Sequence, residues 1–235
     1  MTHLRRFFDD EPESWQDLEL RVQQAFAEMG YESHRDYALQ TVRGTVRIDV
    51  YAVKHSTPIP TIVVCECKHW KKPVDQAVVF TVRSVCADTG AHFGLIISKV
   101  GFQPGAEETR TATNVHLLDF TRFQETFFAE WRTGMFMKLV QLAEPLRPLL
   151  FNRFSGKAPA LEERLKGVNV VDKYAIYFGE ANYSAFFVDD GEFPLDTYDP
   201  RGDPKVLRPI TIVSHRHFYE VSAEGVADAR RYFAV

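Results

Sequence analysis

One apolar run, Thr61–Lys68, constrains the fold of this chain more than any other segment. The run reads Thr-Ile-Val-Val-Cys-Glu-Cys-Lys, and prolines at positions 58 and 60 precede it. A run this apolar does not suit a solvent-exposed edge, because it is typical of strands that are covered on both faces. The sequence therefore predicts a sheet in which Thr61–Lys68 is a central strand.

Patterns on both sides of this strand supply the rest of an α/β domain. A first helix is predicted after Ser14, a good N-cap residue, because Trp15, Leu18, Val22, Phe26 and Met29 recur at helical spacing. Further strands are predicted at 33–39, 45–53, 93–98 and 115–118, and helices at about 74–85 and 104–113. This order predicts an α/β fold with a central mixed β-sheet flanked by helices.

The C-terminal half is expected to be organised differently. We expect a first domain over 1–120, a long amphipathic helix over 121–147 and a small α+β region over 160–235. Within that region, short strands are predicted at 174–178, 185–188 and 209–213, and a final helix capped near Ser222. The aromatic stripe of the long helix needs a partner surface, which could be the first domain, a second copy of the chain or another protein.

Composition narrows the class of protein. Hydrophobic content of 45% and charged content of 26% are ordinary for a globular chain. A net charge of −4 argues against a uniformly basic coat for nucleic acid, although a local basic groove remains possible. No stretch reaches the length of a membrane-spanning helix, the N-terminal residues lack a signal-peptide core, and three cysteines form no disulfide framework. We expect a cytoplasmic protein with no membrane partner.

Candidate chemistry lies on two strands that follow each other in the chain. Asp49 interrupts the strand at 45–53, and Glu66 and Lys68 share one face of the next strand. If the strands pair, Asp49 lies beside Glu66, and a divalent cation would relieve the repulsion of the two carboxylates. Mg²⁺ (or Mn²⁺) suits oxygen ligands, here Asp49, Glu66 and the main-chain carbonyl of Cys67. With Lys68 near an attacking water, this set predicts phosphodiester hydrolysis.

Each of these residues also has a plainer interpretation. A Glu-x-Lys pattern occurs on many exposed strands, and the cysteines at 65 and 67 favour core packing over zinc binding, because they face opposite sides of a strand. Glu19 adjoins the apolar stripe of the first helix and could face the core. His215 and His217 are expected to be polar residues at the end of a strand, and Trp70 could stack on a base or pack in the core.

Four residues near the predicted site are candidate DNA contacts. Lys71 and Lys72 form a basic turn directly after the strand, where they would meet the phosphate backbone or simply face solvent. Ser98 and Lys99 end the strand predicted at 93–98, where they could touch phosphate or cap a loop.

Residues 15–120 resemble the Mrr-like restriction endonuclease family within the PD-(D/E)xK nuclease superfamily. The resemblance lies in a series of segments in order, among them Trp-Gln-Asp-Leu-Glu-Leu from Trp15, Arg-Ile-Asp-Val at 47–50, Val-Cys-Glu-Cys-Lys-His-Trp at 64–70, Gly-Leu-Ile-Ile-Ser at 94–98, and Val-His-Leu-Leu-Asp at 115–119. It implies a restriction-endonuclease-like αβββαβ core that cuts DNA with Mg²⁺. The family often has a richer glycine run before the aspartate and glutamine in place of Glu66.

Residue roles follow from the resemblance for several positions. It implies that Asp49 and Glu66 are metal ligands, that Lys68 is the catalytic lysine and that Glu19 is an accessory glutamate. Gln76 resembles the helix glutamine of exonuclease-type relatives and is a further candidate DNA contact. The predicted function is a Mg²⁺-dependent DNA endonuclease in restriction, defence or DNA processing. The alternative is a nuclease-like module that binds DNA or protein without cutting.

Overall fold

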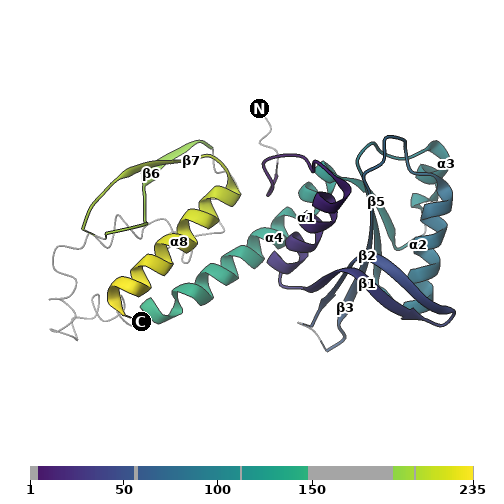
Figure 1. Cartoon of the computed structure of the whole chain (residues 1–235), viewed down its shortest axis with the longest axis horizontal. Coiled ribbons are helices and arrows are strands. Elements are labelled where there is room, and N and C mark those ends of the chain that lie inside the picture. Colours follow the sequence, from purple (N-terminus) through teal and green to yellow (C-terminus); the bar gives the residue numbers. More distant parts are fainter. Residues whose placement is uncertain (1–4, 56–57, 112, 148–192, 204, 235) are drawn as a thin grey trace. The chain divides into compact units, whose positions relative to one another are not determined.

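The computed structural model describes residues 5–55, 58–111, 113–147, 193–203 and 205–234 (Figure 1). The chain divides into two compact units, Leu4–Arg132, and Thr133–Val235 together with Met1–His3. The strands predicted at 174–178 and 185–188 lie outside the described residues. Within the described part of the chain, no helix is both long enough and apolar enough to cross a membrane.

A five-stranded mixed sheet, in the order β1-β2-β3-β4-β5, forms the centre of the unit Leu4–Arg132. The strands are β1 (Glu32–Thr41), β2 (Gly44–Lys54), β3 (Thr61–Lys68), β4 (Phe93–Ser98) and β5 (Val115–Asp119). The first three pair antiparallel, and β3, β4 and β5 pair parallel. The predicted α/β fold class is confirmed, and β3 is the middle strand of the sheet, as its apolar sequence predicted.

Helix α1 (Trp15–Glu28) packs against one face of the sheet, through β1, β2 and β3. It begins where the Ser14 hydroxyl accepts a hydrogen bond from the Asp17 N–H at 3.1 Å, and the chain turns away at Gly30 with a φ of 86°. Leu18, Val22 and Phe26 are buried as predicted. Trp15, the first of the apolar residues at helical spacing, is 54% exposed. It is the first helical residue, and the buried part of the helix starts at Leu18.

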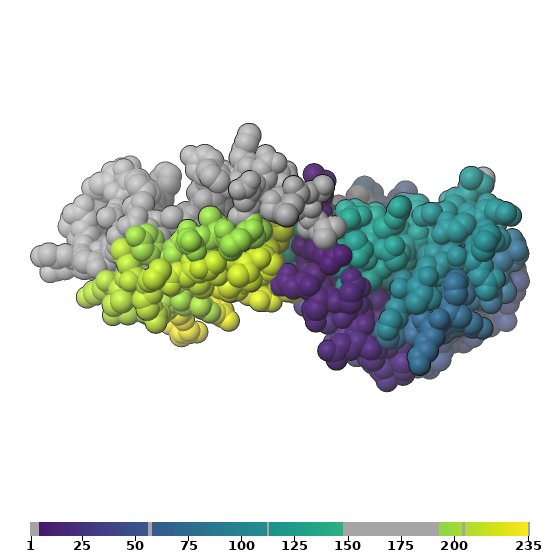
Figure 2. Space-filling model, turned by 90° about the horizontal axis from the view of Figure 1, so that it is seen from above, coloured from purple at the N-terminus to yellow at the C-terminus, as the bar shows by residue number. Residues whose placement is uncertain are grey.

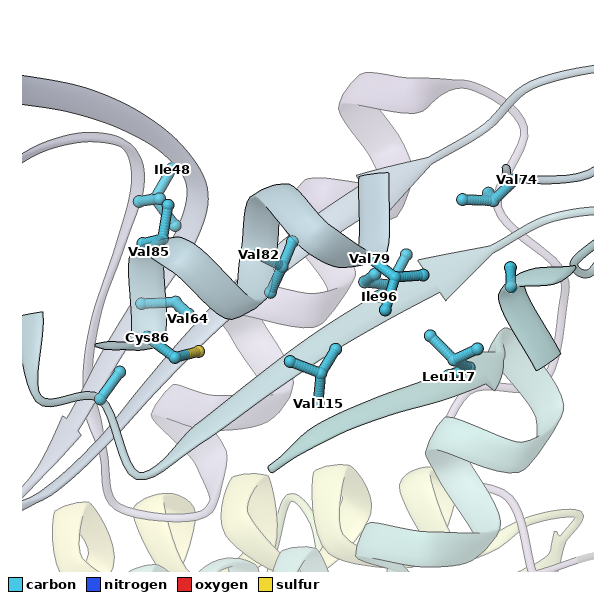
Figure 3. Close-up of a cluster of buried hydrophobic side chains, with 12 residues drawn as sticks. Ile48, Val64, Val74, Val79, Val82, Val85, Cys86, Ile96, Val115 and Leu117 are labelled. Carbon is cyan, nitrogen blue, oxygen red and sulfur yellow. The ribbon is translucent and has the colours of Figure 1, made fainter. Parts of the chain in front are cut away.

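Helix α2 (Gln76–Thr89), α3 (Pro104–Glu107) and the short η1 (Glu108–Arg110) lie on the opposite face of the sheet (Figure 1). Asp75 caps α2, so Val74 lies before the helix and not within it. A largely aliphatic cluster joins α2 to the strands (Figure 3): Ile48, Val64, Val79, Val82, Val85, Cys86, Ile96, Val115 and Leu117. The cluster packs the strands that carry the candidate site tightly against α2.

Helix α4 (Phe120–Ala143) begins directly after β5, and its residues up to Arg132 belong to the same unit as the sheet. Phe123 and Trp131 are fully buried, and Phe7 stacks on the Trp131 ring at 5.1 Å between centroids. The Gln124 side-chain oxygen accepts hydrogen bonds from the Phe7 and Phe8 N–H groups at 3.1 and 2.7 Å. Figure 2 shows the purple N-terminal segment against teal surface. The first half of the aromatic stripe is therefore covered by its own unit.

The unit Thr133–Val235 contains β6 (Leu195–Tyr198), β7 (Pro209–Ile212), η2 (Glu144–Leu146) and α8 (His215–Phe233). β6 and β7 pair antiparallel. The final helix was predicted near Ser222, which is wrong, because Ser214 caps the helix and its hydroxyl accepts from the His217 N–H at 3.1 Å. His215 and His217 are therefore in the first turn of α8, not at a strand end, and Ser222 is buried inside the helix.

Candidate active site

The Asp49 carboxylate lies where β2 and β3 stop pairing. The antiparallel register runs from Lys54↔Thr61 to Val50↔Cys65, so the next positions along the two strands are Asp49 and Glu66. No further backbone pair follows there, and Asp49 Oδ2 instead accepts a hydrogen bond from the Cys67 N–H at 2.8 Å. At the end of the β2–β3 pairing, the Asp49 side chain therefore replaces a main-chain carbonyl as the hydrogen-bond acceptor. This bond fixes the Asp49 carboxylate beside the residues that end β3.

A local distortion in β1 accompanies this break. The β1–β2 register passes from Arg35↔Val50 to Tyr37↔Ile48 and leaves Asp36 and Asp49 unmatched between them. Asp36 has a φ of 49°, in the left-handed region that only a few residue types tolerate. The register is the same on both sides of the break, so no residue is inserted, and the irregular backbone at Asp36 interrupts the pairing beside Asp49. The sequence does not show this feature, although aspartate is one of the residues that adopt a left-handed conformation.

The Lys68 ammonium lies between the two carboxylates. Lys68 Nζ is 3.6 Å from Asp49 Oδ2 and donates a hydrogen bond to Glu66 Oε1. The three side chains are only partly accessible, with Lys68 at 15% exposure, Glu66 at 24% and Asp49 at 27%. The neighbouring strands β2 and β3 therefore bring together the three residues that the sequence singled out.

Burial and neighbouring charges shift the pKa values of Glu66 and Lys68. Burial, and then the nearby Asp49 charge, raise the pKa of Glu66, while the Lys68 ammonium opposes that change. For Lys68, burial favours the neutral amine, but the hydrogen bond to Glu66 and the charges of Glu66 and Asp49 outweigh burial and raise its pKa. The group therefore holds a stable ammonium beside a carboxylate that is reluctant to ionise.

Glu19 brings a third carboxylate to the site from α1. Burial first, and the charge of Asp49 second, raise the pKa of Glu19 to about 6, and Lys68 is among the groups that lower it. The Asp49 and Lys68 charges therefore act on Glu19, which lies near the candidate site. Its accessory role stays a prediction.

The donor atoms of the site fit a hard divalent cation. Asp49 and Glu66 contact the Lys68 ammonium, Glu19 is close enough for the Asp49 charge to affect its pKa, and the main-chain carbonyl of Cys67 adds a further oxygen at this end of β3. Among the described residues, no group of three or more His, Cys, Asp and Glu side chains is arranged to hold a metal by side chains alone. A cation here would therefore need a main-chain oxygen, water or substrate to complete its ligands, which is how Mg²⁺ is often bound.

The two cysteines of β3 behave as core residues. Cys65 and Cys67 are buried free thiols, and burial raises the pKa of both well above the ordinary value. A protonated thiol is a poor zinc ligand. The structure therefore favours the packing interpretation of these residues over zinc binding.

The candidate DNA contacts occupy two short segments after β3 and β4. Lys71 and Lys72 are exposed in the turn that follows β3, and Gln76 is exposed as the first residue of α2. Lys99 is exposed, and its N–H donates to the Lys68 carbonyl at 3.0 Å. Ser98 is buried, and its hydroxyl donates to the Gly101 carbonyl at 2.9 Å and accepts from the Gly101 N–H at 3.1 Å. The structure favours the loop-cap alternative for Ser98.

Two further features lie near the site: Trp70, which the sequence offered for base stacking or core packing, and a hollow that the sequence did not indicate. Trp70 places its ring 5.4 Å from Lys68 Nζ, measured to the ring centroid. A hollow of about 350 Å³ lies beyond the carboxyl ends of β3 and β4, with His69, Lys99, Asp119 and Glu11 among its lining residues. The contact between Trp70 and Lys68 and the lining of the hollow depend on tertiary structure, so neither is directly visible in the sequence.

The match to a family model supports the assignment of the first unit. Residues 11–127 match the profile of the Mrr catalytic domain, described as a restriction endonuclease. The comparison with curated proteins gave no match. A solved structure of a protein of unknown function, AF1548, is 18% identical over 46% of this chain and 58% of that chain, with a TM-score of 0.39.

A second solved structure also matches. The MspJI restriction endonuclease in complex with a 27-mer oligonucleotide is 17% identical over 52% of this chain, with a TM-score of 0.32. The match spans 28% of that chain, so this protein corresponds to a minor part of its length. The assignment rests on the family match over the sheet, α1 and the start of α4. Residues 11–127 of this chain belong to the restriction endonuclease family of Mrr catalytic domains.

Proposed function

We propose that this chain is a Mg²⁺- or Mn²⁺-dependent DNA endonuclease that hydrolyses phosphodiester bonds in restriction, defence or DNA processing. One observation carries the proposal: Asp49 and Glu66 converge on the Lys68 ammonium at the point where β2 leaves β3. The family match supports a nuclease in general terms. The metal, the DNA substrate and the residue roles are our inference from the geometry.

Each residue of the site has a distinct task in this proposal. Asp49, Glu66 and the Cys67 carbonyl would hold the cation, and Glu19 would add negative charge or bind a water near it. When bound, the cation would supply Lewis-acid chemistry to a phosphoryl oxygen and its bound water. Lys68, whose ammonium donates a hydrogen bond to Glu66, would hold the attacking water and stabilise negative charge on phosphate.

Positive charge that could bind a polyanion lies on the surface close to the site. Lys71, Lys72 and Lys99 follow the ends of β3 and β4 and are exposed, whereas the whole chain has a net charge of −4. Contacts from a few lysines to phosphates position a duplex without reading its sequence. We therefore propose DNA as the partner, bound across the carboxyl ends of these strands.

Cleavage and gel-shift assays on the same protein batches test this proposal. Lys68→Ala should lower the cleavage rate roughly a hundredfold to a thousandfold, the effect of removing a single transition-state donor. DNA binding should persist, because the other lysines supply most of the affinity. Lys205→Ala is the matched control, since Lys205 is an exposed lysine of the other unit.

Two results would overturn the assignment. If the wild-type chain binds DNA but cuts none with any divalent metal, the module that binds without cutting is correct. If wild type and Lys68→Ala cut equally fast, the site has been placed on the wrong residues. Cleavage that continues undiminished in excess chelator would refute the metal requirement.

A further inference from the structure

Trp70 contacts the proposed catalytic lysine and a second lysine through its ring. The ring centroid is 5.4 Å from Lys68 Nζ and 5.6 Å from Lys72 Nζ. The side chain is 36% exposed, so it is not simply a core residue. The face of a tryptophan ring carries negative electrostatic potential and attracts cations within about 6 Å of its centroid.

The ring completes a set of three partners around one ammonium. Asp49 and Glu66 are the other two, and both are proposed ligands of a divalent cation. A cation on these carboxylates would repel the ammonium and compete with it for the same oxygens. The Trp70 ring would keep its attraction for Lys68, because an uncharged ring is not neutralised by the metal.

We propose that Trp70 is a positioning residue, whose ring holds the Lys68 ammonium at the edge of the site when a divalent cation occupies Asp49 and Glu66. This inference rests on the proposed metal-dependent function. Trp70 need not touch the reacting atoms, since it acts through Lys68. Stacking on a DNA base is a different role, and it would change substrate binding rather than the chemical step.

Two substitutions at Trp70 distinguish the effect of the aromatic ring from the effect of side-chain volume. Trp70→Phe keeps an aromatic face, and Trp70→Leu keeps an apolar side chain without one. We expect Trp70→Leu to lower kcat roughly fivefold to thirtyfold with little change in KM, the range expected for one partly desolvated cation–π contact. Trp70→Phe should restore most of the rate. Tyr232→Leu, at an exposed aromatic residue of α8, is the matched control.

A second measurement does not depend on cleavage. The NMR signals of the Lys68 ε-methylene group should be shifted upfield by the nearby ring in the wild-type chain, and Lys68→Arg identifies them by their loss. The shift should persist when Mg²⁺ is added to wild type, and it should be absent in Trp70→Leu with or without Mg²⁺. Circular dichroism of each variant shows that the fold is intact.

The outcomes are distinct. A Lys68 signal that loses its upfield shift on Mg²⁺ addition overturns the proposal, as does a wild-type kcat in Trp70→Leu. A raised KM with unchanged kcat also overturns it and points to contact with DNA. If the wild-type chain cuts no DNA, the proposed nuclease function fails, and the Mg²⁺ titration still decides whether the ring holds Lys68.

Discussion

Replacing Glu19 by glutamine should raise the free energy of unfolding and also lower the rate of DNA cleavage. Glu19 lies on α1 near the candidate site, where burial first and the Asp49 charge second raise its pKa from 4.5 to about 6. A carboxyl whose pKa rises on folding contributes stability that is fully present below its unfolded pKa. That contribution is lost as the pH rises through about 6. Glutamine has the same shape and stays neutral at every pH.

The size of the effect follows from the shift. A change from 4.5 to about 6 corresponds to about 2 kcal/mol, and partial exposure of the side chain reduces this to about 1 kcal/mol. The gain in the variant should be complete at about pH 8 and absent below about pH 4. For a chain of this size, about 1 kcal/mol raises the Tm by roughly 2–4 °C.

Thermal unfolding across this pH range, in metal-free buffer, measures the gain. Glu125→Gln is the matched control, because Glu125 is an exposed carboxylate on α4 of the same unit. A gain for Glu19→Gln that is equal at acid and alkaline pH would refute the electrostatic explanation, and so would a lower Tm at about pH 8. Mg²⁺ should raise the Tm of wild type more than that of Glu19→Gln, and the variant should cleave DNA more slowly.

Three further changes test the surrounding structure. Asp36→Gly should leave the cleavage rate unchanged, and Asp36→Val should lower it about tenfold. The reason is that glycine adopts a positive φ without the ~1–2 kcal/mol cost that other residues incur. Equal rates for the two variants in cleavage assays would show that the distortion is not needed. Gly94→Ala should lower the unfolding free energy by about 1–3 kcal/mol, since the added Cβ would lie 2.7 Å from a valine of α2; an unchanged denaturant midpoint would contradict this contact. A fragment ending at Asp119 should aggregate, because it loses the buried aromatic residues of α4. One ending at Ala143 should stay monodisperse in gel filtration, and a monodisperse shorter fragment would show that α4 is dispensable.

The strands buried on both faces could be predicted best from the sequence. β3 (Thr61–Lys68) and β4 (Phe93–Ser98) have the bounds that their apolar runs indicate. Both lie inside the sheet between layers of helix, so nearly every position favours an apolar residue. β1 is more exposed and polar, and its predicted range of 33–39 is shorter than the observed Glu32–Thr41.

The start of the last helix could not be predicted as well, for a physical reason. The first turn of α8 carries His215 and His217 at its start, and its buried side begins at Phe218. A polar first turn resembles the end of the preceding strand when only periodicity is considered. Ser222 looked like a cap because serine favours that position, yet it is a small buried residue inside the helix.

The candidate site could likewise be predicted only in part from the sequence. Strand alternation and spacing were enough to bring Asp49, Glu66 and Lys68 together, because a period of two is a fixed property of strands. The left-handed conformation of Asp36 and the contact of Trp70 with Lys68 depend on tertiary structure. The sequence carries no direct sign of either feature.

The charge balance of the site is consistent with the proposed cation. Lys68 pairs with Asp49 and Glu66, and Glu19 is a third acid nearby. Burial and repulsion raise the pKa of Glu66 and of Glu19, so the folded chain is destabilised when both are ionised. Perturbed groups that weaken a fold concentrate at functional sites. A divalent cation would remove the repulsion and release the proton of Glu19, so its binding should strengthen as the pH rises through about 6.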